Sequence, residues 1–131
     1  MTTGTGLSAT ALTETPRRGE VWLVALGAGR AGEPRKTRPA VVVSSDHLTT
    51  GSTNELIIVV PVSSSRAPSA LRVQVGPEAG LDRPSLAICR AVRAVVSSRL
   101  VRRIGHVDQS TMRQVQDALS VILELDRPNA D

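Results

Sequence analysis

The sequence predicts a small, mostly β domain, a barrel or curled antiparallel sheet, followed by one C-terminal helix. Short apolar runs rich in β-branched residues recur along the chain, and turn-forming residues bound each of them. Residues 71–75 alternate strictly between apolar and polar side chains, which is typical of a half-exposed strand. A helical period occurs near the C-terminus, over residues 109–125. Short strands with one terminal helix favour a curled sheet with the helix packed against it.

The first expected strand covers residues 20–26, and the second begins at Pro39 and continues to Val43. Proline has no backbone N–H, so we expect Pro39 at the first strand residue, where no ladder bond is lost. A third apolar run covers residues 56–62. Consecutive strands of a small sheet are usually neighbours, so the second and third strands should lie side by side.

Two loops flank these strands. Residues 27–36 contain three glycines and a proline, and residues 63–69 are rich in serine. Loops of such length in a compact domain are usually functional or disordered. The connection 46–54 is polar, and its His47 is interpreted as an ordinary exposed loop residue.

The second half of the chain continues the pattern. Four further elements are expected: strands over 71–75, 85–95 and 102–107, and a helical turn over 97–100 capped by Ser97.

The terminal helix is the clearest single element. Asp108 is a suitable N-cap for it. Met112, Val115, Leu119 and Ile122 fall on one helical face, which we expect to pack on the sheet. The domain should therefore cover residues 17–125, between a disordered leader over 1–16 and a tail over 126–131.

The charge of the chain favours an anionic partner. The formal net charge is +4, and all the basic residues except Lys36 are arginines, whose planar fork suits phosphate. A codon bias towards G and C would also inflate arginine, and composition alone leaves both explanations open. No acidic residue lies between Asp82 and Asp108, whereas six arginines do: Arg83, Arg90, Arg93, Arg99, Arg102 and Arg103. We call these six the arginine block, a candidate phosphate-binding surface.

Several classes of protein are disfavoured. Cys89 is the single cysteine, so the chain has no internal disulfide and no thiolate metal cluster. No segment approaches the roughly 18 apolar residues of a membrane span, and the N-terminus does not resemble a signal peptide. We therefore expect a cytoplasmic protein. Trp22 is the sole aromatic residue, so RNA could not be bound on an aromatic stacking platform.

One pair of residues stands out as a candidate site. Arg38 precedes the second strand directly, and Ser63 follows the third strand. If the two strands are neighbours, a guanidinium and a hydroxyl come together at one sheet end and can bind an anion. The alternative is that both are solvated loop residues.

Short motifs then follow one another in a characteristic order. The chain reads Arg-Arg-Gly-Glu-Val-Trp over 17–22, Lys-Thr-Arg-Pro-Ala-Val-Val-Val-Ser over 36–44 and Val-Pro-Val-Ser-Ser over 60–64. Later come Gly80-Leu81 through Ser85, Arg93, Arg99-Leu100 and Ile104-Gly105. Together with the terminal helix, this series resembles the MazF/PemK family of bacterial toxins over residues 17–125.

The resemblance implies a homodimeric, SH3-like barrel that cleaves single-stranded RNA, whether mRNA, tRNA or rRNA, without a metal or other cofactor. In that family the RNA 2′-hydroxyl attacks, leaving a 2′,3′-cyclic phosphate and a 5′-hydroxyl. The catalytic residues would correspond to Arg38 and Ser63. Serine stands where the family usually has threonine, so a neighbouring serine remains an alternative source of the hydroxyl. Whether Arg38 donates a proton or stabilises charge also remains open.

The resemblance further implies RNA contacts and a protein partner. Ala91 stands where the family often has glutamine, and that difference bears on RNA selection. A cognate antitoxin with an acidic, partly disordered segment would neutralise the toxin. The expected RNA-binding residues are Glu33, Lys36, Thr37, Ser64, Ser65, Arg66, Arg90 and Arg93.

Two other functions remain compatible with the same fold, because a fold does not fix an activity. Gyrase-poisoning toxins share it and act through an aromatic residue near the C-terminus, whereas this chain ends Arg-Pro-Asn-Ala-Asp. An inactive dimer that binds only an antitoxin is the other alternative.

Overall fold

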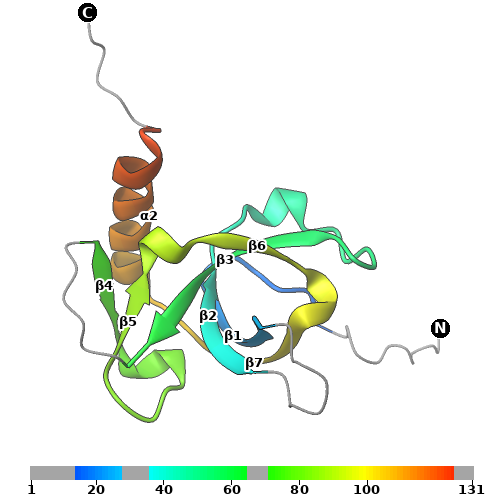
Figure 1. Ribbon diagram of the computed structural model, residues 1–131, viewed down its shortest axis with the longest axis horizontal. Coiled ribbons are helices and arrows are strands. Elements are labelled where there is room, and N and C mark those ends of the chain that lie inside the picture. Colours follow the sequence, from blue (N-terminus) through cyan, green and yellow to red (C-terminus); the bar gives the residue numbers. More distant parts are fainter. Residues whose placement is uncertain (1–13, 28–35, 65–70, 126–131) are drawn as a thin grey trace, which may run out of the picture.

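The computed structural model describes residues 14–27, 36–64 and 71–125 of the 131-residue chain (Figure 1). The strands are β1 (Glu20–Ala25), β2 (Thr37–Val42), β3 (Leu56–Ser63), β4 (Arg72–Val75), β5 (Ser85–Ile88), β6 (Arg93–Val96) and β7 (Leu100–His106). The α-helix is α2 (Gln109–Leu123). Single 3₁₀ turns are η2 (Asp46–Leu48), η3 (Pro77–Ala79), η4 (Cys89–Ala91) and η5 (Ser97–Arg99).

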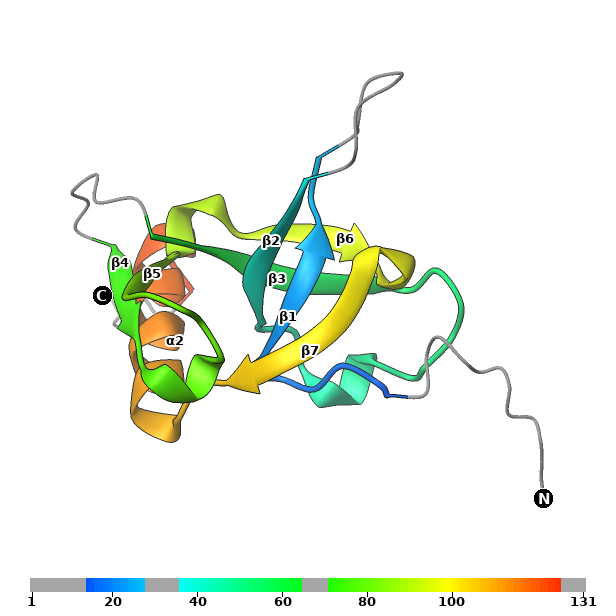
Figure 2. The ribbon, with the colours of Figure 1, turned by 90° about the horizontal axis from the view of Figure 1, so that it is seen from below.

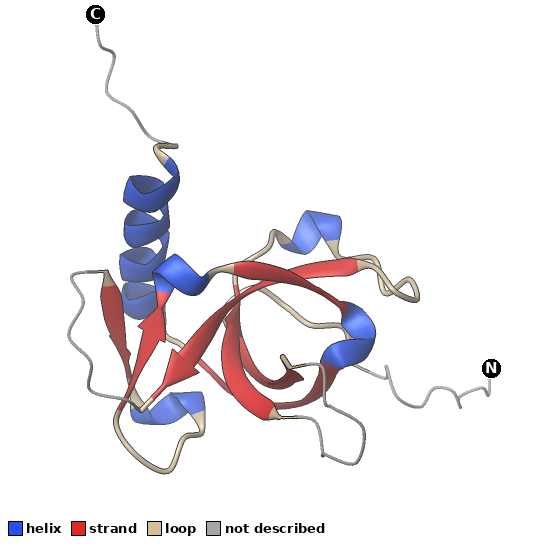
Figure 3. Ribbon diagram, viewed as in Figure 1, coloured by secondary structure: helices blue, strands red, loops and turns tan. Residues whose placement is uncertain are grey.

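The strands form one curled antiparallel sheet in the order β4-β5-β3-β2-β1-β7, and β6 also pairs with β3. The chain passes from β6 through η5 into β7, which pairs with β1 and so closes a small barrel (Figures 2 and 3). The helix lies beside β4 and β5, away from the barrel (Figure 1). The predicted mostly β fold with a terminal helix is confirmed, as is the pairing of β2 with β3.

Two apolar cores lie on opposite faces of this sheet. Alternation along β2 sends Ala40 and Val42 into the barrel, while Val41 faces the helix. The consecutive apolar residues of β2 are therefore explained by burial on both faces. The barrel core comprises Trp22, Val24, Ala40, Val42, Ile57, Val59, Val95 and Leu100. The helix core includes Val41, Val60, Val62, Val73, Val75, Ala87, Val115 and Ala118.

Pro39 does not begin its strand, contrary to the prediction. It is the third residue of β2 and lies opposite Leu23 of β1. The β2–β3 ladder starts only at the Ala40–Pro61 pair, so on that side Pro39 removes no ladder bond. The strand can therefore extend back to Thr37.

The single strand predicted over 85–95 is also wrong, because η4 divides it into β5 and β6. Both pieces pair with the same edge of β3. Two residues of β3 separate Val59 from Val62, but five residues separate their partners Arg93 and Ala87. The 3₁₀ turn absorbs the three additional residues, which interrupt the ladder as a large, special bulge.

The two predicted helix caps have different outcomes. The Ser97 side chain does not cap η5, whose N-cap is Val96, and Ser97 is instead buried. Asp108 caps α2 as predicted, its carboxylate accepting from the Thr111 amide at 2.8 Å. Hydrogen bonds from Thr111 hold the pKa of Asp108 below its usual value, so the ionised cap is favoured.

The segment before β1 contacts the barrel where it is described. Glu14 pairs with Arg103 at 3.4 Å, and Pro16 is buried. The rest of the expected leader, residues 1–13, lies outside the described residues, as does the tail over 126–131. Within the described segments, the helix is too short and too polar to cross a membrane.

Candidate active site

Arg38 is the second residue of β2 and pairs across the sheet with Val24 of β1. Alternation puts it on the same face of β2 as Ala40 and Val42, which belong to the barrel core. The residue is exposed, and within the described part of the chain its guanidinium makes no hydrogen bond or ion pair. A strand-borne cation is therefore available to an anionic ligand.

Ser63 ends the neighbouring strand β3. In the β2–β3 ladder Val41 pairs with Val60 and Ala40 with Pro61. The β2–β3 ladder ends at that second pair, and Arg38 and Ser63 each lie two residues beyond it, Arg38 paired with Val24 and Ser63 with Leu86. Strand alternation gives both side chains the same face. The structure thus brings Arg38 and the half-buried Ser63 to one end of two adjacent strands.

Two residues on that face were not identified from the sequence. Ser63 pairs with Leu86 of β5, which in turn pairs with Gln74 of β4. The next row, formed by Val62, Ala87 and Val73, faces the helix core and is buried. The row of Ser63, Leu86 and Gln74 is half-buried or exposed, and it extends the candidate surface away from Arg38. The polar Gln74 in an alternating strand was the one available signal.

The arginines Arg93 and Arg99 have partners inside the protein. The Nη1 of Arg93, at the start of β6, donates to the Leu26 carbonyl at 3.4 Å. The Nη1 of Arg99 donates to the carbonyls of Ala25 at 2.9 Å and Gly27 at 3.5 Å. Arg93, predicted to bind RNA, thus also contacts the end of β1.

The other predicted RNA-binding residues divide into three groups. Lys36 and Thr37 are exposed and precede Arg38, and Ser64 is exposed directly after β3. Arg90 is exposed in η4, a turn that contacts α2, which places it apart from Arg38. Glu33, Ser65 and Arg66 lie outside the described residues.

The arginine block does not form one continuous unpaired surface. Arg103 makes ion pairs with Glu20 at 3.1 Å and Glu14 at 3.4 Å. Both carboxylates come from the N-terminal part of the chain, which folds back beside β7. The lack of acidic residues between Asp82 and Asp108 therefore did not predict the local charge.

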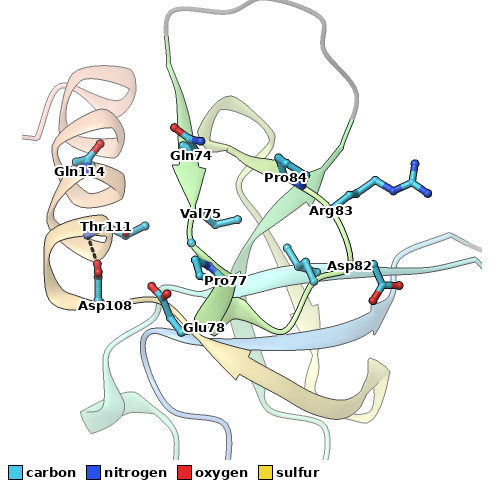
Figure 4. Close-up of a pocket in the computed structure, with 12 residues that line it drawn as sticks. Gln74, Val75, Pro77, Glu78, Asp82, Arg83, Pro84, Asp108, Thr111 and Gln114 are labelled. Atoms are coloured by element: carbon cyan, nitrogen blue, oxygen red, sulfur yellow. Dashed lines mark hydrogen bonds between the residues drawn. The ribbon is translucent and has the colours of Figure 1, made fainter.

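A cavity of about 610 Å³ lies between α2, β4 and the segment 76–84, and Gln74 is one of the residues that line it (Figure 4). Of the described residues that line it, three carry carboxylates, Glu78, Asp82 and Asp108, and one carries a cation, Arg83. This excess of negative charge disfavours the binding of phosphate there. Within the described segments, no three His, Cys, Asp or Glu side chains gather as metal ligands would.

Comparison with known proteins agrees with this architecture. The chain is 36% identical over 115 residues to the endoribonuclease MazF9 of Mycobacterium tuberculosis, covering 83% of this chain and 97% of the relative. Among solved structures, MazF from Deinococcus radiodurans superposes with a TM-score of 0.70 at 20% identity, covering 86% of this chain and 99% of that one. A mycobacterial endoribonuclease solved in complex with its cognate antitoxin gives a TM-score of 0.68 at 23% identity, with coverages of 86% and 99%.

The family assignment rests on the whole domain. A family model described as "PemK-like, MazF-like toxin of type II toxin-antitoxin system" matches residues 17–123. That span contains every motif on which the resemblance was based. The chain therefore belongs to the PemK/MazF family of toxins of type II toxin–antitoxin systems.

Proposed function

We propose that this toxin is an endoribonuclease that cleaves single-stranded RNA, with Arg38 and Ser63 as its catalytic residues. The supporting observation is the exposed guanidinium of Arg38, unpaired within the described residues, on a strand whose neighbour ends in a hydroxyl. The relative at 36% identity is itself named an endoribonuclease. A net charge of +4 suits a polyanionic substrate.

In the proposed reaction the 2′-hydroxyl of the RNA attacks the adjacent phosphorus. The new 2′-O–P bond forms as the P–O5′ bond breaks, giving a 2′,3′-cyclic phosphate and a 5′-hydroxyl. The 2′-hydroxyl loses its proton to solvent, and the departing 5′-oxygen gains one. Negative charge grows on the phosphoryl oxygens, and a preorganised Arg38 stabilises it more in the transition state than in the ground state. Because a guanidinium scarcely deprotonates in proteins, we assign Arg38 charge stabilisation rather than proton donation.

Ser63 is assigned a hydrogen bond to the scissile phosphate. Replacing Ser63 with Ala should lower kcat by about tenfold or more, because a transition-state hydrogen bond is lost. Ser63→Thr should retain most activity, since it keeps the hydroxyl and stiffens the side chain. Single-turnover cleavage of a labelled RNA measures both variants. Equal rates for Ala and Thr variants would instead assign the hydroxyl to Ser64 or Ser65.

We further propose that the protein works as a homodimer. Leu56 pairs with Val96 and Ile58 with Ala94 on the outer face of β3 and β6, and Leu56 is 63% exposed. Leu56, Ile58 and Ala94 are exposed and Val96 is half-buried, and an aliphatic patch of this kind favours association with another protein surface.

The dimer prediction can be tested at this patch. The double variant Leu56→Glu, Ile58→Glu should sediment as a folded monomer, because buried charges oppose association. Val101→Glu is the matched control, since Val101 is 56% exposed elsewhere, on β7. A double variant that still sediments as a dimer, beside an unchanged control, would refute this interface.

Neutralisation is assigned to a cognate antitoxin, consistent with the complex solved for the mycobacterial neighbour. An acidic, partly disordered segment that orders on binding would suit the positive charge of the toxin. It would compete with RNA for Arg38.

Incubation of the purified protein with labelled mRNA, tRNA and rRNA tests the proposed function against its alternatives. Cleavage that an acidic antitoxin suppresses supports the nuclease. RNA left intact while gyrase is trapped on DNA would assign a gyrase poison, and RNA left intact with antitoxin binding alone would assign an inactive regulator.

A further inference from the structure

Beyond the point where β7 stops pairing with β1, arginine side chains form hydrogen bonds to the end of β1. The last β1–β7 pair joins Val24 to Leu100. One residue earlier along the chain from Leu100 lies Arg99, which belongs to the 3₁₀ turn η5 and has left the ladder. On its other edge β1 still pairs with β2, through Ala25 and Thr37.

On the edge of β1 that no longer pairs with β7, the side chain of Arg99 donates hydrogen bonds to the backbone. Its Nη1 lies 2.9 Å from the Ala25 carbonyl oxygen and 3.5 Å from that of Gly27. From β6, Arg93 Nη1 reaches the intervening Leu26 carbonyl at 3.4 Å. Three consecutive carbonyls thus accept from two guanidiniums. Arg99 is the better placed, because its contacts are partly buried and that of Arg93 is exposed.

Residues 25–27 lie beside residues 36–38 at the end of the β1–β2 pair, and we call these two segments the neck. The Leu26 amide donates to the Lys36 carbonyl at 3.2 Å, which closes the neck two residues before Arg38. Val24, next to Ala25, is the cross-strand partner of Arg38. A shift of the end of β1 would therefore also move the backbone of β2 that carries Arg38.

We propose that Arg99 is a positioning residue, which fixes the neck of residues 25–27 and 36–38 and thereby aims Arg38. This proposal rests on the proposed function for its catalytic consequence, but the positioning itself is a property of the fold. Arginine matters here because its planar guanidinium fixes the N–H directions of the Nη1 that donates to both carbonyls, whereas a lysine ammonium rotates on a flexible stem. Arg99 touches no reacting atom in the proposed reaction.

The test compares Arg99→Gln and Arg99→Lys with Arg113→Gln. Arg113 is exposed on α2 and makes no hydrogen bond or ion pair within the described part of the chain, so it controls for the lost charge. Hydrogen exchange of the Leu26 amide reports the neck without any need for activity. Steady-state cleavage of RNA separates kcat from KM.

In Arg99→Gln the Leu26 amide should exchange about tenfold faster or more, since hydrogen bonds from a charged donor are lost. The kcat should fall about 10- to 100-fold with little change in KM, because the catalytic group is misplaced rather than removed. For Arg99→Lys, both the exchange rate of the Leu26 amide and kcat should lie between those of wild type and Arg99→Gln. If Arg99→Gln does not fold, the test relies on Arg99→Lys. Arg113→Gln should match wild type in both measurements.

Unchanged Leu26 exchange in the Arg99 variants would overturn the proposal, and so would faster exchange with wild-type kcat. A fall in kcat equalled by Arg113→Gln would assign the effect to net charge and would overturn it too. If the wild-type protein cleaves no RNA, the proposed function fails, while the exchange of Leu26 still decides whether Arg99 positions the neck.

Discussion

Replacing Arg38 with alanine should abolish RNA cleavage and leave the fold intact. A preorganised donor aimed at developing phosphoryl charge is worth about 100-fold or more in kcat. The side chain is exposed and makes no hydrogen bond or ion pair within the described residues. Its removal should therefore change the free energy of unfolding little. Circular dichroism and thermal unfolding check the fold, and single-turnover kinetics on labelled RNA measure the loss.

The conservative variant sharpens this test. Arg38→Lys should also be impaired, because a point charge does not replace a bidentate fork. Arg113→Ala controls for charge, and it should cleave at the wild-type rate. Folded Arg38→Ala protein that cuts at the wild-type rate would remove Arg38 from the reaction.

Replacing Gly105 with alanine should cause the largest loss of stability among the substitutions considered. A Cβ there would lie 2.4 Å from the Ala79 carbonyl carbon and 2.5 Å from the Glu78 carbonyl oxygen. Both are backbone atoms of η3, which packs directly on β7, so no side chain can move aside. We expect a loss of about 3 kcal/mol or more, and a fall in Tm of about 10 °C. Thermal and urea unfolding measure both quantities.

Gly27→Ala is the matched control. Among the described residues, a Cβ at Gly27 would meet only the Lys36 Cβ, at an ordinary 3.9 Å, so the stability of Gly27→Ala should change little. A Gly105→Ala protein as stable as Gly27→Ala would show that η3 does not pack closely on β7. The Ile104-Gly105 motif therefore has a structural explanation, namely a close approach of two backbone segments.

Most of the strands and the helix could be predicted from the sequence, because the pattern of apolar residues that become buried lies within each element. The valines of β2 and β3 and the apolar face of α2 each identified an element correctly. The break at Cys89–Ala91 could not be predicted, since no Gly, Pro or Asn marks the three additional residues. It results from pairing β5 and β6 with a single strand, and that register is a long-range property.

The positions of Arg38 and Ser63 in the strands could be predicted for a similar reason. Both residues flank apolar runs, and the predicted pairing of β2 with β3 is observed. The environments of Arg99 and Arg103 depend on carbonyls and carboxylates from distant parts of the chain. Charge counted along the sequence therefore placed both arginines on a binding surface, although each has partners inside the protein.

In the proposed reaction, RNA is cut by its own 2′-hydroxyl with the help of Arg38. The most direct measurement is a digest of single-stranded RNA in EDTA, with the termini of the products identified by mass spectrometry. We predict 2′,3′-cyclic phosphates and 5′-hydroxyls with the wild-type protein, and no new termini with Arg38→Ala. Products ending in a 3′-hydroxyl and a 5′-phosphate, or identical products from Arg38→Ala, would contradict the claim.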